Sequence, residues 1–208
     1  MTLDAETLRR LAPARFHPAP PLVAGRGDAD LNPDTADLRN PDGLAVPAAV
    51  LVPIIARPPG LTILLTTRTA DLPSHPGQVS FPGGKIDPGD DGPLAAALRE
   101  ANEEIGLDES FVEPLGYLDT YQTGTGFLIS PVVALVAEGF NLHLNTREVA
   151  GAFEVPLAFL LDPANHQRQS REWRGKLRHF YVMPYGDHYI WGVTAGMIRN
   201  LYDRLMGP

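Results

Sequence analysis

A glycine-rich turn followed by an acidic helix, over residues 83–107, is the feature that most constrains this chain of 208 residues. The stretch opens with two glycines and continues through a run of turn-forming residues to Pro93. Proline suits the first position of a helix, where its missing N–H costs nothing, and glycine suits the left-handed position that ends one. Pro93 and Gly106 therefore predict a helix over residues 93–105.

The predicted helix carries an acidic stripe beside an apolar one. At 100° per residue, one side holds Leu94, Ala97, Leu98, Ala101 and Ile105. Glu100, Glu103 and Glu104 fall together on another side, and each like-charge pair at these spacings costs an isolated helix about 0.2–0.5 kcal/mol. Arg99 can reach Glu103 at i+4, but one guanidinium cannot neutralise three acids.

A hard divalent cation is the remaining partner for these carboxylates. Mg²⁺ is held in proteins by one or two carboxylates and completes its shell with water and substrate phosphates. The alternative is an acidic helix face that is simply solvated. The glycine-rich turn before the helix, the Arg-Glu pair at its middle and the glycine after its last acids favour the metal site.

Residues 99–107, REANEEIGL, resemble the second half of the Nudix box, REUxEExGU, in which U is an aliphatic or small residue. Gly84 resembles the glycine that opens the box. The family hydrolyses nucleoside diphosphates linked to another moiety, with Mg²⁺ or Mn²⁺ held by acids of the helix. The resemblance implies an α/β class fold, an α/β/α sandwich with a mixed β-sheet between helices. It also implies that Arg99 braces the acids and that the metal ligands are Glu100, Glu103 and Glu104.

The box departs from the family pattern in one respect. Fourteen residues separate Gly84 from Arg99, where thirteen are usual, and an aspartate replaces the glutamate that supports the motif arginine. Counting forward from Gly84 leads to Asp90, whereas counting back from Arg99 leads to Asp91. The sequence does not choose between the two aspartates.

Hydrolysis of a phosphoanhydride needs neutralised oxygens, a positioned water and a group that deprotonates that water. We expect Gly83 and Gly84 to shape a phosphate-binding loop, because turns of this kind and helix N-termini favour anions. In the family the water is activated by a helix glutamate or by an acid from a later loop. This leaves Glu103, Glu104 and Glu148 as candidates for the base.

Residues 64–84 resemble the additional signature of the coenzyme A pyrophosphatase branch, roughly LLTxRSxxx(R/K)xxxGxxxFPGG. The spacing of Arg68, Gly77 and Phe81 agrees with it without a gap. The resemblance implies that Arg68 and Phe81, with the two glycines that follow, contribute to substrate binding.

Two positions depart from this signature. Thr69 replaces a serine and keeps the hydroxyl, whereas Pro73 replaces an arginine or lysine. The second change removes a charge-assisted contact with phosphate, which is typically worth about 1.5–3 kcal/mol. His75, two residues further on, is a candidate to replace that cation in part. Residues 190–195 also resemble this branch, although packing in the core is the preferred interpretation of Trp191 within them.

These resemblances imply a Mg²⁺- or Mn²⁺-dependent hydrolase of coenzyme A or acyl-coenzyme A. The products would be 4′-phosphopantetheine, or its acyl form, and adenosine 3′,5′-bisphosphate. Another nucleoside diphosphate derivative, such as ADP-ribose, a dinucleotide or a nucleoside triphosphate, is an alternative substrate that Pro73 keeps open. A non-catalytic nucleotide-binding module is a second alternative.

Composition narrows the partners. A net charge of −8 disfavours binding to a nucleic-acid polymer, and the absence of cysteine excludes disulfides, zinc–thiolate sites and a cysteine nucleophile. No apolar run approaches 18 residues and no basic segment with an apolar core opens the chain, so we expect a cytoplasmic protein without membrane contact. The sequence is compatible with a homodimer but does not fix the oligomeric state.

The remaining pattern predicts an amino-terminal helix and proline-rich arm over residues 1–44, followed by one hydrolase domain over residues 45–208. The helix is expected at 3–12, ended by Pro13, and the arm is expected to be extended. Strands are expected at 45–55, 61–67, 78–82, 111–122, 127–137, 140–144, 178–184 and 188–191. Helical segments are expected at 147–153, 157–161 and 193–206. Pro47 and Pro53 favour an edge or a bulge for the first strand.

Overall fold

The computed structural model describes residues 3–33, 45–72, 75–173 and 175–207, and Pro73 lies outside them. Its helices are α1 (Ala5–Arg15), α2 (Gly92–Ile105), α3 (Leu157–Leu160) and α4 (Gly192–Met206). Strands of the main sheet are β1 (Arg26–Gly27), β2 (Val46–Arg57), β3 (Gly60–Arg68), β4 (Val79–Ser80), β5 (Gly83–Lys85), β6 (Val112–Tyr117), β7 (Tyr121–Gln122), β8 (Phe127–Val136) and β9 (Val149–Pro156). A second sheet contains β10 (Gln167–Trp173), β11 (Lys176–Tyr185) and β12 (His188–Trp191).

The main sheet is mixed. Its path is β1-β7-β8-β2-β3-β4, and β5, β6 and β9 pair with β2, β8 and β3 respectively. β2 and β8 pair in parallel over residues 46–55 and 127–136, whereas β2 and β3 form an antiparallel hairpin. β2–β3, β7–β8 and β11–β12 are antiparallel pairs of strands that follow each other in the chain.

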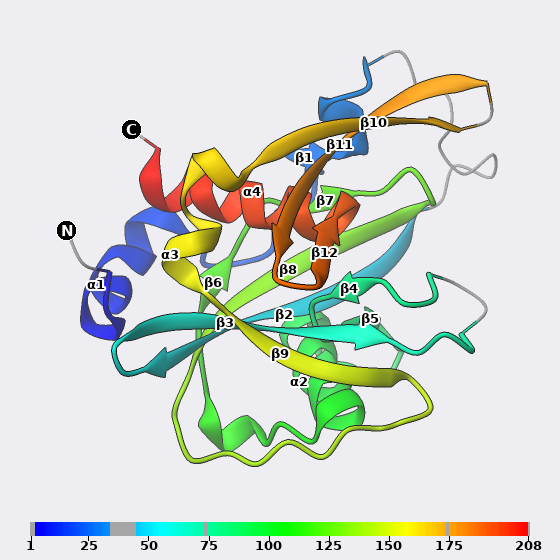
Figure 1. Cartoon of the computed structure of the whole chain (residues 1–208). Helices are drawn as coiled ribbons and strands as arrows, with labels where there is room; N and C mark the ends of the chain where they lie inside the picture. The colour runs from blue at the N-terminus through cyan, green and yellow to red at the C-terminus, as the bar shows by residue number, and fades with distance from the viewer. Residues whose placement is uncertain (1–2, 34–44, 73–74, 174, 208) are drawn as a thin grey trace.

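Helices cover both faces of the main sheet (Figure 1). One face packs on α2, and the other packs on α1, α3, α4 and the small sheet. The alternation along β8 shows why, because Val132 and Ala134 join the core on the α2 side while Val133 and Leu135 join the core on the α4 side. The predicted α/β/α sandwich is confirmed.

The prediction that prolines place the first strand at an edge or at a bulge is wrong, because β2 lies between β8 and β3 and pairs with β8 without a register shift. Leu51 donates its N–H to Pro82, so Pro53, two residues further on, directs its nitrogen to the same side. That side changes partner here, since β5 pairs with residues 48–50 and β3 with residues 54–57. The missing N–H of Pro53 therefore falls between the two ladders.

Three further expectations are corrected. The first helix continues through Pro13 to Arg15. Residues 147–153, expected to be helical, mostly form β9, which gains its hydrogen bonds from β3. Residues 140–144 form no strand, whereas the polar stretch 167–173 forms β10, whose side chains are all exposed and whose pairing comes from β11.

Part of the arm packs against the main sheet. Arg26 and Gly27 form β1 alongside β7, and Thr120 donates a hydrogen bond to the carbonyl of Pro21 at 2.6 Å. Asp28 accepts hydrogen bonds from the Tyr121 hydroxyl at 2.9 Å and from a backbone N–H at 2.7 Å. In the described part of the chain, no helix is long and apolar enough to cross a membrane.

Asp119 ties the two ends of the chain together. Its carboxylate accepts hydrogen bonds from Asn200 at 2.8 Å and from Arg204 Nε at 3.0 Å, both in α4, and lies 3.1 Å from the ring of His17 after α1. Burial alone would raise the pKa of Asp119, but the hydrogen bonds from Arg204, Asn200 and His17 hold it well below its usual range.

We predict that Asp119→Asn lowers the free energy of unfolding by about 1–3 kcal/mol at pH 7, because the partly buried Arg204 loses its carboxylate. A carboxylate with a lowered pKa stabilises the fold above its unfolded-state pKa, about 4, and loses that contribution as pH falls. The deficit of the variant should therefore shrink between pH 4 and pH 2. Urea unfolding across this range tests it, with Asp187→Asn in an exposed turn as control. An equal deficit at both ends would contradict the prediction.

Candidate metal-binding and catalytic site

Helix α2 forms as the sequence predicts, starting one residue earlier at Gly92. Gly106 ends it in the left-handed conformation with φ 67°, and its N–H donates to the carbonyls of Ala101 and Asn102. The buried side of the helix includes Ala97 and Ile105, which pack under the sheet. It also includes Glu104, which is only 4% exposed, so the acidic and apolar stripes overlap at this residue.

The two glycines before the helix lie in strand β5 rather than in a loop. Gly83 pairs with Val50 and Gly84 with Ala49, which corrects the expected phosphate-binding loop. A Cβ on Gly84 would lie 2.7 Å from Glu100 Oε2, so glycine is needed for this carboxylate to approach the strand. Gly83 has φ 155°, and its N–H donates to Glu104 Oε2 at 3.2 Å. The pair therefore brings β5 against the helix acids.

Arg99 organises the acidic side of α2. Its Nε and Nη2 donate to the two carboxylate oxygens of Asp90 at 2.9 and 3.0 Å, and its Nη1 donates to Glu100 at 3.0 Å and to Glu103 at 3.1 Å. Hydrogen bonding to Arg99 lowers the pKa of Asp90. Asp91 occupies the N-cap position of α2, but its side chain forms no hydrogen bond with the first turn of the helix. Asp90 thus takes the place that the sequence left open between two aspartates.

Burial changes the acidity of two helix carboxylates. It raises the pKa of Glu104 to about 7, against a lowering by the hydrogen bond from Gly83, and Glu100 and Glu148 raise it further. Burial also raises the pKa of Glu100, with Glu103 and Glu148 acting in the same direction and Arg99 opposing them. Glu148 therefore lies close enough to share one negative field with the helix acids. It is exposed, in the turn before β9, and accepts a hydrogen bond from Asn145.

The chemistry of these donors fits a hard divalent cation. All are carboxylate oxygens, and the negative charges of neighbouring acids raise the pKa of Glu100 and of Glu104. Among the described residues, no three acidic or histidine side chains are grouped as they would be around a bound cation. Glu100 and Glu103 instead share Arg99 Nη1 as their hydrogen-bond donor. A metal bound here would compete with Arg99 for these two carboxylates.

The substrate residues expected from the sequence are divided by the structure. Arg68, at the end of β3, lowers the pKa of Glu104 by its charge, and its Nε is buried without a hydrogen-bond partner among the described residues. Phe81 is 2% exposed and packs in the core, and its contact with substrate stays a prediction. His75 is exposed and hydrogen-bonds Gln78 at 3.0 Å.

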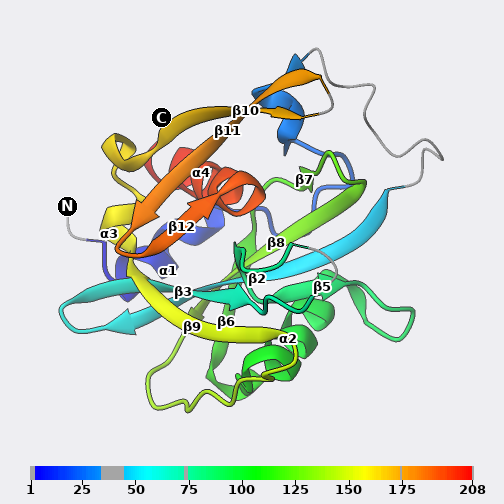
Figure 2. The ribbon, with the colours of Figure 1, turned by 45° about the vertical axis from the view of Figure 1, so that its right-hand side comes forward.

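A cleft of about 440 Å³ lies beside His75 and Gln78, and most of its residues were not expected from the sequence. We call it the aromatic cleft, and its principal side chains are Arg171, Trp173, Arg178, Phe180 and Trp191. Residues of the arm, of the β7–β8 turn and of the start of α4 line its other sides. Figure 2 shows β10 and β11 extending from α4 towards the arm. Trp191 is half-buried and lines this cleft, which corrects its interpretation as a core residue.

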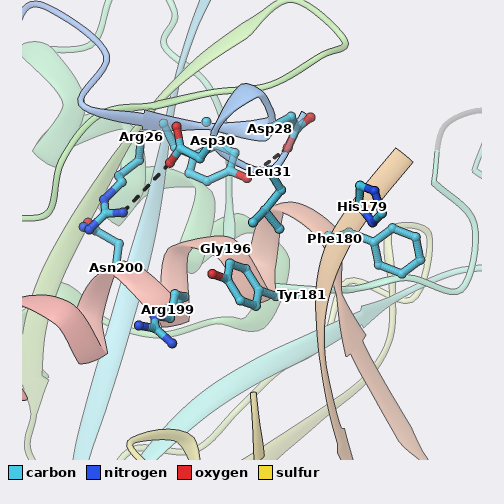
Figure 3. A pocket seen from close by; sticks show the side chains of 13 residues that line it. Arg26, Asp28, Asp30, Leu31, His179, Phe180, Tyr181, Gly196, Arg199 and Asn200 are labelled. Carbon is cyan, nitrogen blue, oxygen red and sulfur yellow. Dashed lines mark hydrogen bonds and ion pairs between the residues drawn. The ribbon is translucent and has the colours of Figure 1, made fainter. Parts of the chain in front are cut away.

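A smaller cavity of about 50 Å³ adjoins the aromatic cleft and shares Asp28, His179, Phe180 and Gly192 with it (Figure 3). Arg26 and Asp30, from the arm, lie across it from Arg199 of α4. The polar stretch 167–173 offered one signal for this region, namely an arginine and a tryptophan at alternate positions, Arg171 and Trp173. The stretch has no alternating apolar residues, so the pattern did not indicate a strand.

Comparison with known proteins gives a consistent result. A family model described as "NUDIX domain" matches residues 46–174. A protein of Photorhabdus laumondii named "Uncharacterized Nudix hydrolase NudL" is 45% identical over 158 residues, covering 76% of this chain and 84% of that protein. Its namesake in Yersinia enterocolitica is 44% identical over 164 residues, covering 76% and 80%. The crystal structure of DR0079 from Deinococcus radiodurans aligns with a TM-score of 0.50 at 16% identity, over 78% of this chain and 88% of that one, a likeness of fold alone.

We predict that Asp90→Ala weakens Mn²⁺ binding about ten- to a hundredfold, because Arg99 is then free to hold Glu100 and Glu103 more tightly. Substitution of a residue that holds and orients a metal ligand through hydrogen bonds commonly lowers metal affinity by this factor. Calorimetric titration with Mn²⁺ measures it. The matched control is Asp91→Ala, one residue away and without a bond to Arg99, which should stay within about twofold. Equal effects of the two substitutions would show that Asp90 does not control the acids.

Proposed function

The chain belongs to the Nudix family, and we propose that it hydrolyses the pyrophosphate linkage of coenzyme A or an acyl-coenzyme A. Members of this family are hydrolases that generally use divalent metal ions. The products proposed here are adenosine 3′,5′-bisphosphate and 4′-phosphopantetheine or its acyl form. In this proposal Mg²⁺ or Mn²⁺ is the cofactor and the substrate is a small nucleotide.

The observation that carries the choice of coenzyme A is Arg68. It occupies the arginine position of the coenzyme A signature, and its charge acts on the buried Glu104. Its Nε is buried without a hydrogen-bond partner among the described residues, which is unfavourable unless a ligand supplies an acceptor. A phosphate oxygen of the substrate is the acceptor that this guanidinium suits best.

Each acidic residue of α2 has a role in the proposal. Glu100, Glu103 and Glu104 hold the metal, which when bound neutralises the developing charge on the phosphate oxygens. Arg99, fixed by Asp90, keeps the carboxylates in place. Gly84 leaves the space through which Glu100 reaches the strand.

The proton of the attacking water needs an acceptor at this site. Glu103, Glu104 and Glu148 are the three carboxylates that we propose for it, because all take part in one electrostatic cluster. Glu104 has a pKa of about 7, which suits proton transfer near neutral pH, while Glu103 and Glu148 are exposed and open to solvent.

We predict that Glu103→Gln lowers kcat for coenzyme A hydrolysis by a factor of about 100 or more, because it removes a negatively charged metal ligand. Release of adenosine 3′,5′-bisphosphate at fixed Mg²⁺ measures it. Glu109→Gln, an exposed acid just after α2, is the control and should stay within about twofold. Turnover of Glu103→Gln within twofold of the wild type would refute the metal assignment.

Substrate choice needs its own experiment. We predict that kcat/KM for coenzyme A exceeds that for ADP-ribose, a dinucleotide and a nucleoside triphosphate by about tenfold or more, since the signature around Arg68 matches that branch. A higher kcat/KM for one of the other compounds would identify that compound as the substrate, the alternative that Pro73 leaves open. Binding of these compounds without release of phosphate-containing products would instead indicate a nucleotide-binding module.

A further inference from the structure

We propose that the aromatic cleft binds the nucleoside end of the substrate and that Arg171 and Arg178 select nucleotides with a phosphate on the ribose. This inference rests on the proposed function, because it assigns one half of that substrate to a place on the protein. The cleft has a volume of about 440 Å³, which is within the range of small-molecule sites.

The strongest observation is a pair of like charges facing each other across two strands. Arg171 of β10 and Arg178 of β11 are direct cross-strand partners, so their side chains leave the same face of the sheet. Like charges at such positions destabilise a sheet. Within the described residues, neither arginine forms an ion pair with a carboxylate.

Arg178 is also short of hydrogen bonds. Its Nε and Nη2 are buried without a partner among the described residues, while its guanidinium lies 4.6 Å from the centre of the Trp173 ring. Buried donors of this kind are rare because each carries a desolvation penalty. Asp28, an acid of the same cleft, already accepts hydrogen bonds from Tyr121 and Gly124. An anionic ligand is the partner that would satisfy Arg178.

Aromatic rings accompany these cations. Trp173 and Phe180 share the face of Arg178 by the alternation of the strand register, and Trp191 comes from β12 on the next strand. Phe180 and Trp191 pack edge to face with ring centres 5.3 Å apart. Rings beside guanidinium groups suit a planar base that carries phosphate, since bases stack on aromatic side chains without needing a specific sequence.

The start of α4 adds a further attraction for an anion. Gly192, Val193 and Thr194 line the cleft, and the helix begins at Gly192 with no side-chain cap. Its first N–H groups and the positive end of its dipole therefore face this region. The chain as a whole carries −8, so this concentration of positive charge is local.

The cleft lies within reach of the helix acids. Thr194, at the cleft, donates a hydrogen bond to the carbonyl of Val79 at 2.9 Å, and Gly83 donates one to Glu104 at 3.2 Å. Four residue steps separate Val79 from Gly83, and they span at most about 14 Å. One extended ligand can therefore occupy the cleft with its nucleoside and the acidic face with its diphosphate.

The test compares two nucleotides on metal-free protein by calorimetric titration. We expect adenosine 3′,5′-bisphosphate to bind the wild type about tenfold or more tightly than adenosine 5′-monophosphate. Arg178→Gln and Arg171→Gln should each reduce that preference to within about threefold, and Arg178→Lys should retain part of it. Arg168→Gln is the matched control, because Arg168 is exposed on the opposite face of β10 and should leave the preference unchanged.

Hydrolysis provides a second readout of the same selection. The ratio of kcat/KM for coenzyme A to that for dephospho-coenzyme A should fall about tenfold in Arg178→Gln and stay constant in Arg168→Gln. A wild type that binds both nucleotides equally, or an Arg178→Gln variant that keeps the full preference, would overturn the inference. A wild type that prefers the bisphosphate yet does not cleave coenzyme A would refute the proposed function and leave the cleft assignment supported.

Discussion

The interaction on which the site depends is the one between Arg99 and Asp90. Two parallel hydrogen bonds fix the guanidinium plane, so its remaining Nη1 is held at a defined place against Glu100 and Glu103. Without that restraint, acids at i, i+3 and i+4 would repel one another across one helix face. The aspartate is a methylene shorter than the glutamate of the family pattern, and the additional residue between Gly84 and Arg99 accompanies it.

The local parts of this arrangement could be predicted from sequence because their determinants are adjacent in the chain. Pro93 and Gly106 mark the ends of α2, and a spacing of three and four residues brings its acids together. The choice between Asp90 and Asp91 could not be made, since both satisfy the count and only the fold decides which carboxylate reaches Arg99. The same holds for Glu104, whose raised pKa comes from burial under β5 and cannot be seen in the pattern of α2 alone.

The parts that sequence reasoning missed depend on pairing between distant segments. The sequence pattern predicts a helical segment at 147–153, but most of these residues form β9, whose pairing with β3 supplies the hydrogen bonds of a strand. β10 is polar and exposed throughout, so its sequence lacks the apolar alternation that would predict a strand. Only its register with β11 places Arg171 opposite Arg178. The cleft follows from that register. Its lining residues come from distant parts of the chain; Asn32 and Trp173, for example, are 141 positions apart.

The charge distribution connects these two outcomes. A chain of net charge −8 gathers carboxylates along α2 and in the turn before β9, and it gathers arginines with aromatic rings on the small sheet. A diphosphate alone would bind the acidic surface through a bridging cation and would not contact the arginines of the small sheet. A substrate that continues from the diphosphate into a base and a further phosphate would use both, because its negative charges are then divided between a metal held by acids and guanidinium groups held by a sheet. The separation of the two surfaces by a short anchored segment, from Val79 to Gly83, makes such a division physically reasonable.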